Sequence, residues 1–93
     1  MRGVRSPERS RRAGRLAASP ADELRNRLRE VRQAAELTQA SLAERTGITR
    51  QTIIAIERGG YVPSLALALA LARELSTPVD ELFWLGRAKG EEA

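Results

Sequence analysis

The sequence contains no cysteine and no histidine among its 93 residues. This absence excludes disulfide frameworks, thiolate nucleophiles and zinc fingers or ribbons, because each needs one or both of these residue types. Imidazole general-base catalysis is excluded for the same reason. Any catalysis would rest on carboxylates or hydroxyls, and no carboxylate pair or nucleophile–base set stands out. We therefore expect no enzyme, no catalytic residue, no metal and no cofactor.

Aromatic residues are also scarce, at 3% of the chain: Tyr61, Phe83 and Trp84. A base-stacking platform of the RNA-recognition or single-strand type needs several exposed rings, so that class is disfavoured. No apolar run approaches the roughly 18 residues that a membrane span requires. Residues 1–20 contain no apolar stretch of the secretory-signal kind. These absences predict a cytoplasmic chain without a membrane segment.

The positive charge is concentrated at the start of the chain. Residues 1–20 contain six Arg and one Glu, a net charge of +5, whereas residues 21–93 contain ten basic and eleven acidic residues, a net charge of −1. A segment so poor in large apolar side chains cannot offset its ordering entropy, which predicts a disordered basic tail over residues 1–20. Its functional interpretation is an arm that binds DNA phosphates. The alternatives are a solvated extension or a start codon assigned too early.

Residues 21–86 carry dense helix punctuation and are predicted to form the folded domain, followed by a short tail over residues 87–93. Four polar residues can accept a hydrogen bond from the first turn of a helix. They are the candidate N-caps Asp22, Thr38, Thr49 and Ser64. Gly47 and Gly59 are candidate helix ends, because glycine adopts the left-handed conformation readily. A short last helix is expected over about residues 79–85, which makes five in all.

The apolar pattern of residues 65–71 alternates strictly between Leu and Ala, as a strand would. We interpret this segment as a helix instead, because both residue types are strong helix formers and no β-branched residue interrupts them. The predicted fold class is therefore all-α, a compact five-helix bundle. Its expected core consists of Leu28, Val31, Leu42, Ile48, Ile53, Ile56, Leu67, Leu71, Leu75, Val79 and Leu82.

Residues 39–58, QASLAERTGITRQTIIAIER, are the most informative segment. Ala43 lies where two helices joined by a tight turn must approach closely, and Gly47 permits the turn. Leu42, Ile48 and two later isoleucines point inward. The side chains left outward on the second helix are Arg50, Gln51, Ile54, Ala55 and Arg58. This spacing is typical of a helix-turn-helix, whose second helix presents side chains to the DNA major groove.

The same residues carry a resemblance to a known family. LRNRLREVRQAAELTQASLAERTGITRQTIIAIERG and the later YVPSLALALALARELSTPVDELFWL, together about residues 24–85, resemble the Cro and lambdoid phage repressor class, also called XRE-type. The second stretch is similar to a group of very small bacterial regulators. The resemblance implies a lambda repressor-like DNA-binding domain. One departure is Thr46, where the family usually has an apolar residue, and we expect only a small loss of stability there.

The resemblance also implies roles for individual residues. Gln39 matches a phosphate-binding position, and a helix N-terminus suits an anion. Arg50 and Gln51 match base-reading positions, since Arg pairs with guanine and Gln with adenine. The full set of expected DNA contacts is Gln39, Thr49, Arg50, Gln51, Ile54, Ala55 and Arg58, with Tyr61 as a further backbone contact.

Three alternatives to these roles stay open. Ile54 follows Ile53 directly and is alternatively a core residue. Arg50 and Gln51 are alternatively solvated surface residues. Arg32 and Glu57 match a structural ion pair that ties the first helix to the recognition helix, and their alternative is independent solvation, since exposed pairs are weak.

The sequence therefore predicts a sequence-specific regulator of transcription that binds double-stranded DNA. We expect it to act as a repressor, as a homodimer on a palindromic operator. The expected dimer surface contains Leu69, Phe83, Trp84 and Leu85, since large rings are enriched at interface centres. The three residues from 83 to 85 are alternatively core. The alternative function is an antitoxin or a bridging module that uses the bundle to bind a protein partner.

Overall fold

The computed structural model describes residues 19–86, so most of the predicted basic tail and all of residues 87–93 lie outside the described residues. Helices dominate the described part. In chain order the elements are η2 (Pro20–Glu23), β1 (Leu24–Asn26), α2 (Leu28–Ala34), α3 (Gln39–Thr46), α4 (Arg50–Arg58), α5 (Leu65–Glu74), α6 (Val79–Leu82) and β2 (Phe83–Leu85).

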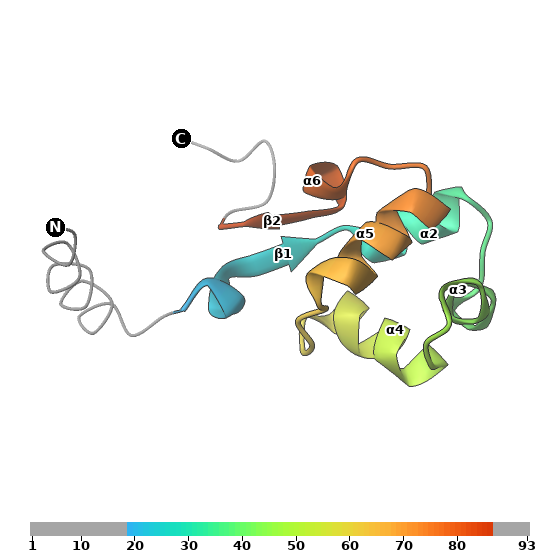
Figure 1. Cartoon of the computed structure of the whole chain (residues 1–93), viewed down its shortest axis with the longest axis horizontal. Helices are drawn as coiled ribbons and strands as arrows, with labels where there is room; N and C mark the ends of the chain where they lie inside the picture. Colours follow the sequence, from blue (N-terminus) through green and yellow to red (C-terminus); the bar gives the residue numbers. More distant parts are fainter. Residues whose placement is uncertain (1–18, 87–93) are drawn as a thin grey trace, which may run out of the picture.

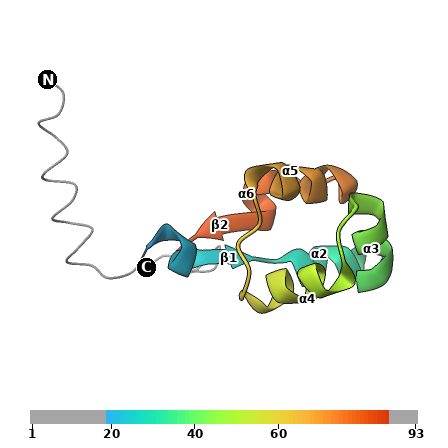
Figure 2. The same cartoon turned by 60° about the horizontal axis from the view of Figure 1, so that its bottom comes forward.

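The helices lie around a shared core, with α4 on one side of the domain and α5 and α6 on the opposite side. Figure 2 shows this separation, with α5 and α6 at the top and α4 at the bottom. The strands β1 and β2 extend away from the helices, toward the end of the domain where the described chain begins and ends (Figure 1). This arrangement leaves one side of α4 uncovered.

Polar caps begin three of the helices, as the sequence predicts. The side chain of Thr38 accepts a hydrogen bond from the Ser41 N–H, that of Thr49 from Thr52, and that of Ser64 from Leu67. Gly47 and Gly59 end α3 and α4 with φ angles of 75° and 85°. Each of these hydrogen bonds satisfies a terminal amide that the helix itself leaves unpaired. The alternating Leu-Ala segment is helical, which confirms the interpretation of residues 65–71.

The prediction of a purely all-α fold is wrong at both ends of the domain. The described residues form five α-helices, α2 to α6, together with an antiparallel pair of strands. In that pair Leu24 lies opposite Leu85, Arg25 opposite Trp84, and Asn26 opposite Phe83. The first helix was expected to begin after Asp22 but begins at Leu28, and the last ends at Leu82 instead of about residue 85.

Local hydrogen bonds explain why the first helix starts late. The Asp22 carboxylate accepts the Ser19 N–H at 3.1 Å, which closes the short 3-10 turn η2 in place of an α-helix. Asn26 then accepts the Leu28 N–H at 2.9 Å through its side-chain oxygen and so marks the start of α2. Asn side chains compete in this way with backbone pairing, and they favour helix starts over helix interiors.

Residues 83–85 form a strand instead of extending the last helix, in keeping with their amino-acid types. Phe83 and Trp84 are aromatic residues, which favour strands, and they follow a helix of four residues only. Phe83 is 8% exposed and belongs to the core of this chain. The Arg27 guanidinium lies 5.5 Å from the centre of the Trp84 ring, a distance compatible with a cation–π contact.

The core agrees with the residues expected from the apolar pattern. Leu28, Leu42, Ile53, Ile56, Leu71, Leu75 and Leu82 are buried, and Val31, Ile48, Leu67 and Val79 pack against them. The Thr46 hydroxyl donates a 2.7 Å hydrogen bond to the Leu42 carbonyl oxygen. This polar group is therefore satisfied within its own helix, which accounts for its tolerance in a position that packs beside the core.

Candidate nucleic-acid interface

The α3–α4 unit is a tight helix pair. Ala43 is 3% exposed, and its carbonyl oxygen accepts the Ile48 N–H at 3.0 Å across the turn. Gly47 has a left-handed backbone conformation in that turn, which a side chain would strain. The small residue and the glycine thus have the positions that the sequence predicts for them, and they set the angle between the two helices.

The second helix of the unit, α4, has an apolar face and a polar face. Ile53 and Ile56 are at most 1% exposed and anchor the helix on the core. Arg50, Gln51 and Arg58 are exposed, as expected. The two apolar members of the outward set, Ile54 and Ala55, are half-buried. They therefore contribute partly to packing and still present some surface.

A buried ion pair connects α2 to the end of α4. The Arg32 Nε atom donates to the Glu57 Oε2 atom at 2.6 Å, and the two side chains are 8% and 5% exposed. A second donor of Arg32, Nη2, lies 3.3 Å from Glu57 Oε1, while Nη1 donates to the Leu37 carbonyl oxygen at 2.8 Å. The Glu57 carboxylate is thereby neutralised beside the surface on which the exposed side chains of α4 lie.

Gln39 also contacts this carboxylate. Its Nε2 atom donates to Glu57 Oε1 at 3.2 Å, so the Glu57 carboxylate fixes the orientation of the Gln39 amide. The Thr49 hydroxyl caps α4 and also lies 3.0 Å from the Thr52 hydroxyl. Tyr61, in the loop after α4, is 45% exposed.

A polar groove of about 620 Å³ runs between α2, the start of α3 and α4. Its lining consists of Arg29, Arg32, Gln33, Leu37, Thr38, Gln39, Ile54, Glu57 and Arg58. Three cations and one carboxylate leave this lining with a formal charge of +2, which favours an anion such as a phosphate. Sequence reasoning missed Arg29 and Gln33, although their spacing of four already places them on one side of the first helix.

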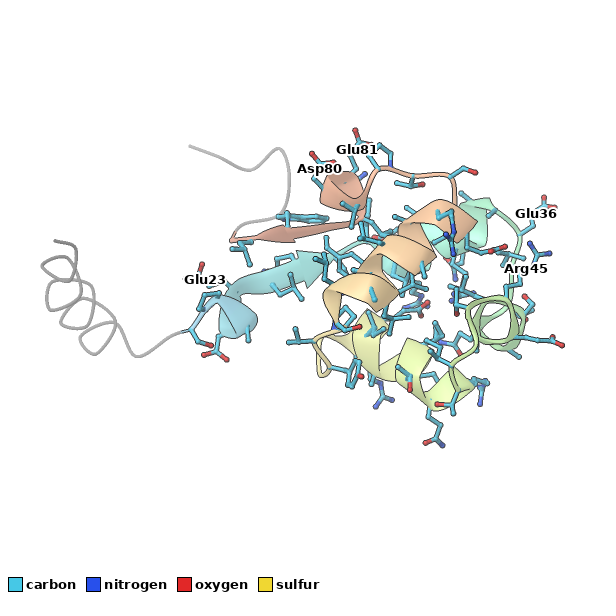
Figure 3. All side chains as sticks on the ribbon, viewed as in Figure 1. Glu23, Glu36, Arg45, Asp80 and Glu81 are labelled. Carbon is cyan, nitrogen blue, oxygen red and sulfur yellow. The ribbon has the colours of Figure 1, made fainter. Side chains whose placement is uncertain are left out.

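Two acidic residues lie on α6, on the side of the domain opposite to α4. Asp80 and Glu81 project from α6, away from α4, as Figure 3 shows. The uncovered side of α4 and the acidic side of α6 therefore face in different directions. This asymmetry orients the molecule with α4 toward a negatively charged partner.

The candidate dimer residues are not all alike in exposure. Leu69 on α5 and Leu85 on β2 are 48% and 57% exposed, whereas Phe83 is buried in its own chain and Trp84 is half-buried. Phe83, Trp84 and Leu85 lie in the strand β2, in which Trp84 is on the opposite face from its two neighbours, and Leu69 belongs to a separate helix. Leu65, one turn before Leu69, is 73% exposed and was absent from the expected set.

Asn26 is another residue that sequence reasoning missed. Its side-chain nitrogen donates to the Ile56 carbonyl oxygen of α4 at 3.0 Å, 30 residues away in the chain. Its position before a helix is a signal for a cap, but nothing in the sequence identifies so distant an acceptor.

Two further classes of site are missing from the part of the chain that the structure describes. Within residues 19–86, no group of three or more acidic side chains is arranged to hold a metal ion. The longest helix of that range, α5, has 10 residues, and none there is long and apolar enough to cross a membrane.

Comparison with known proteins agrees with this geometry. A family model described as "Helix-turn-helix" matches residues 28–82. The "Uncharacterized HTH-type transcriptional regulator YgzD" of Bacillus subtilis is 44% identical over 62 residues, which cover 67% of this chain and 94% of that protein. An "Uncharacterized HTH-type transcriptional regulator" of Methanothermobacter thermautotrophicus is 51% identical over 63 residues, which cover 67% of this chain and 91% of the relative.

A solved structure is similar as well. It is the restriction-modification controller protein C.AhdI from Aeromonas hydrophila, with 39% identity and a TM-score of 0.56 over 58% of this chain and 82% of that one. The chain thus belongs to the XRE-type helix-turn-helix family. It is a transcriptional regulator of the helix-turn-helix class, which binds DNA.

Proposed function

We propose that the protein is a sequence-specific repressor that occupies a palindromic operator in double-stranded DNA as a homodimer. It acts in the cytoplasm, needs no cofactor and catalyses no reaction. The observation that carries this proposal is the α4 surface, where exposed polar side chains begin a helix whose opposite face is anchored on the core.

The α4 surface suits base reading at its first turn. Arg50 and Gln51 are exposed there and are long enough to reach base edges. Arg pairs with guanine O6 and N7, and Gln pairs with adenine N6 and N7, each through two hydrogen bonds. Ile54 and Ala55 on the next turn offer apolar contact to thymine methyl groups. We assign direct readout to these four residues.

The groove beside α4 suits a backbone phosphate. Gln39 stands at the first turn of α3, where free N–H groups attract an anion, and its amide is oriented by Glu57. Arg58 and Arg29 line the same groove and supply positive charge. These contacts position the helix on DNA without reading sequence. We place Thr49 and Tyr61, at the two ends of α4, in the same backbone-contacting class.

The proposal includes a dimer because one helix-turn-helix domain recognises too few base pairs to select an operator alone. A single recognition helix contacts only a few base pairs, and two copies about 34 Å apart double the readout on a palindrome. Exposed apolar side chains on α5 and β2 supply candidate surface for such a pair. Repression would follow from occupying an operator that overlaps a promoter.

The experiment that tests this proposal is a selection. The full chain is incubated with a library of random-sequence duplex DNA, the retained fragments are sequenced, and sedimentation measures the mass of the resulting complex. We expect an enriched palindrome, a complex of two chains, and reduced expression from a reporter promoter that contains the site. No enrichment above the input library would contradict DNA-sequence recognition. Capture of a protein partner in its place would support the bridging or antitoxin role.

A further inference from the structure

An amide side chain is attached to the last turn of the recognition helix, next to the Arg32–Glu57 pair. Asn26 donates from Nδ2 to the Ile56 carbonyl oxygen at 3.0 Å and accepts the Leu28 N–H on Oδ1 at 2.9 Å. One carboxamide therefore joins the start of α2 to the last turn of α4. The Ile56 carbonyl has no amide partner four residues on within its helix, although it also accepts the Gly59 N–H at 2.9 Å.

The backbone of Asn26 is itself fixed. Asn26 lies opposite Phe83 in the strand pair, and the next residue, Arg27, donates its N–H to the Leu82 carbonyl oxygen at 3.1 Å. Phe83 is part of the buried core. The Asn26 side chain is thus an attachment point on a rigid element rather than part of a loop.

The attachments at its two ends fix the tilt of α4 relative to the rest of the domain. Its first residue is attached to α3 through the turn, and its last turn is attached through Asn26 and through the neighbouring Arg32–Glu57 pair. A helix of nine residues is roughly 13 Å long, so a tilt of about 10° displaces one end by about 2 Å relative to the other. Paired hydrogen bonds to a base edge tolerate far less than that displacement.

We propose that Asn26 is a positioning residue that sets the docking angle of the recognition helix and thereby the discrimination between operator and other DNA. It contacts α4 from the side of β1 and η2 and acts through the Ile56 carbonyl. Its contribution is separate from that of Arg32, which acts on the next residue through a carboxylate. For its DNA readout this inference rests on the proposed function.

Two variants separate the hydrogen bond to α4 from the local hydrogen bond to the Leu28 N–H. Asn26→Ala removes both hydrogen bonds. Asn26→Asp keeps an acceptor for the Leu28 N–H and removes the donor to Ile56. Ser64→Ala is the control, because it removes a side-chain hydrogen bond to an amide at the start of another helix, the Leu67 N–H of α5, without touching α4.

The first measurement is the ratio of affinities for the selected operator and for a scrambled duplex. A partly unfolded protein lowers both affinities equally and leaves this ratio unchanged. We expect both Asn26 variants to lower the ratio about tenfold, the size of one lost base contact, and Ser64→Ala to leave it unchanged. An unchanged ratio in Asn26→Asp, with or without a change in Asn26→Ala, would overturn the inference.

The second measurement needs no DNA. Amide hydrogen exchange in the last turn of α4 should become up to about tenfold faster in both Asn26 variants, with α5 unaffected. Equal acceleration in every helix, or none in α4, contradicts the positioning role. A wild-type protein that prefers no sequence refutes the proposed function instead, while the exchange measurement still decides whether Asn26 holds α4.

Discussion

At the scale of single residues, the chemistry of the interface depends on which charges are free and which are neutralised. The carboxylate of Glu57 would repel a phosphate if it were free. Arg32 and Gln39 both donate hydrogen bonds to this carboxylate, and the positive charge of Arg32 neutralises it. Arg50 and Arg58 are exposed and remain available for DNA.

Arg50→Ala tests direct readout. If Arg50 pairs with guanine, its loss should cost roughly 1–3 kcal/mol on the operator and relax the preference at one base pair. Competition binding against operators that carry each single substitution measures both effects. Equal losses on operator and random duplex would make Arg50 a phosphate contact instead.

The Arg32–Glu57 pair has a measurable coupling. Removing either partner alone leaves a buried charge, so Arg32→Ala and Glu57→Ala should each destabilise the domain by about 3–5 kcal/mol. In a double-mutant cycle by urea unfolding, we expect a coupling on the order of 0.5–3 kcal/mol, since the two residues share hydrogen bonds. Additive single effects would show that the contact is energetically irrelevant. Arg45 and Glu74, an exposed pair at 3.3 Å, form the control with little coupling.

At the scale of elements, the ends of the helices determine where the interface residues lie. The recognition helix starts at the Thr49 cap and stops at Gly59, so its nine residues make about two and a half turns. Two other helices end without glycine. Glu36 and Ser76 follow α2 and α5 with φ angles of 61° and 52°, a conformation that L residues adopt only with strain.

Adjacent glycines after α4 provide a matched test of this helix end. Gly59 has a φ of 85°, so Gly59→Ala should cost about 1–2 kcal/mol of stability. Gly60→Ala should change stability little, because its backbone is not left-handed and an added Cβ meets only the Ala55 carbonyl oxygen at 3.9 Å. Thermal unfolding of both variants measures the difference, and equal losses would contradict the backbone explanation.

At the scale of the whole molecule, the proposed homodimer requires that two copies present their recognition helices together. Phe83 is committed to its own core, which leaves Leu85 and Leu69 as the exposed members of the expected surface. These two lie on different elements, β2 and α5. The structure thus offers two candidate faces for a second copy.

Separate substitutions distinguish the two faces. If β2 forms the dimer, Leu85→Asp should yield a folded monomer with weaker operator binding, because a charge would be buried at the interface. Leu69→Asp should do the same if α5 is the interface. Analytical ultracentrifugation beside circular dichroism measures mass and folding together. A wild-type chain that stays monomeric at tens of micromolar and on its operator would exclude the dimer.

Local signals in the sequence determined the helices α3, α4 and α5 and most of the core. The caps Thr38, Thr49 and Ser64 act on amides three residues away, and the apolar spacing of α3, α4 and α5 reflects the helical period. Such interactions lie within one turn of chain, so the residue pattern alone predicts them. The helical period also predicted that Ile53 and Ile56 of α4 are buried and that Arg50, Gln51 and Arg58 are exposed.

The tertiary structure alone decided the features that depend on distant partners. Residues 24–26 became a strand because residues 83–85 lie beside them, and no local pattern reports a partner almost sixty residues away. Asn26 acquired its contact with Ile56, and Gln39 its contact with Glu57, in the same way. Hydrogen-bond partners across a fold depend on how the elements pack, so the sequence predicted the recognition helix while packing determined what holds it in place.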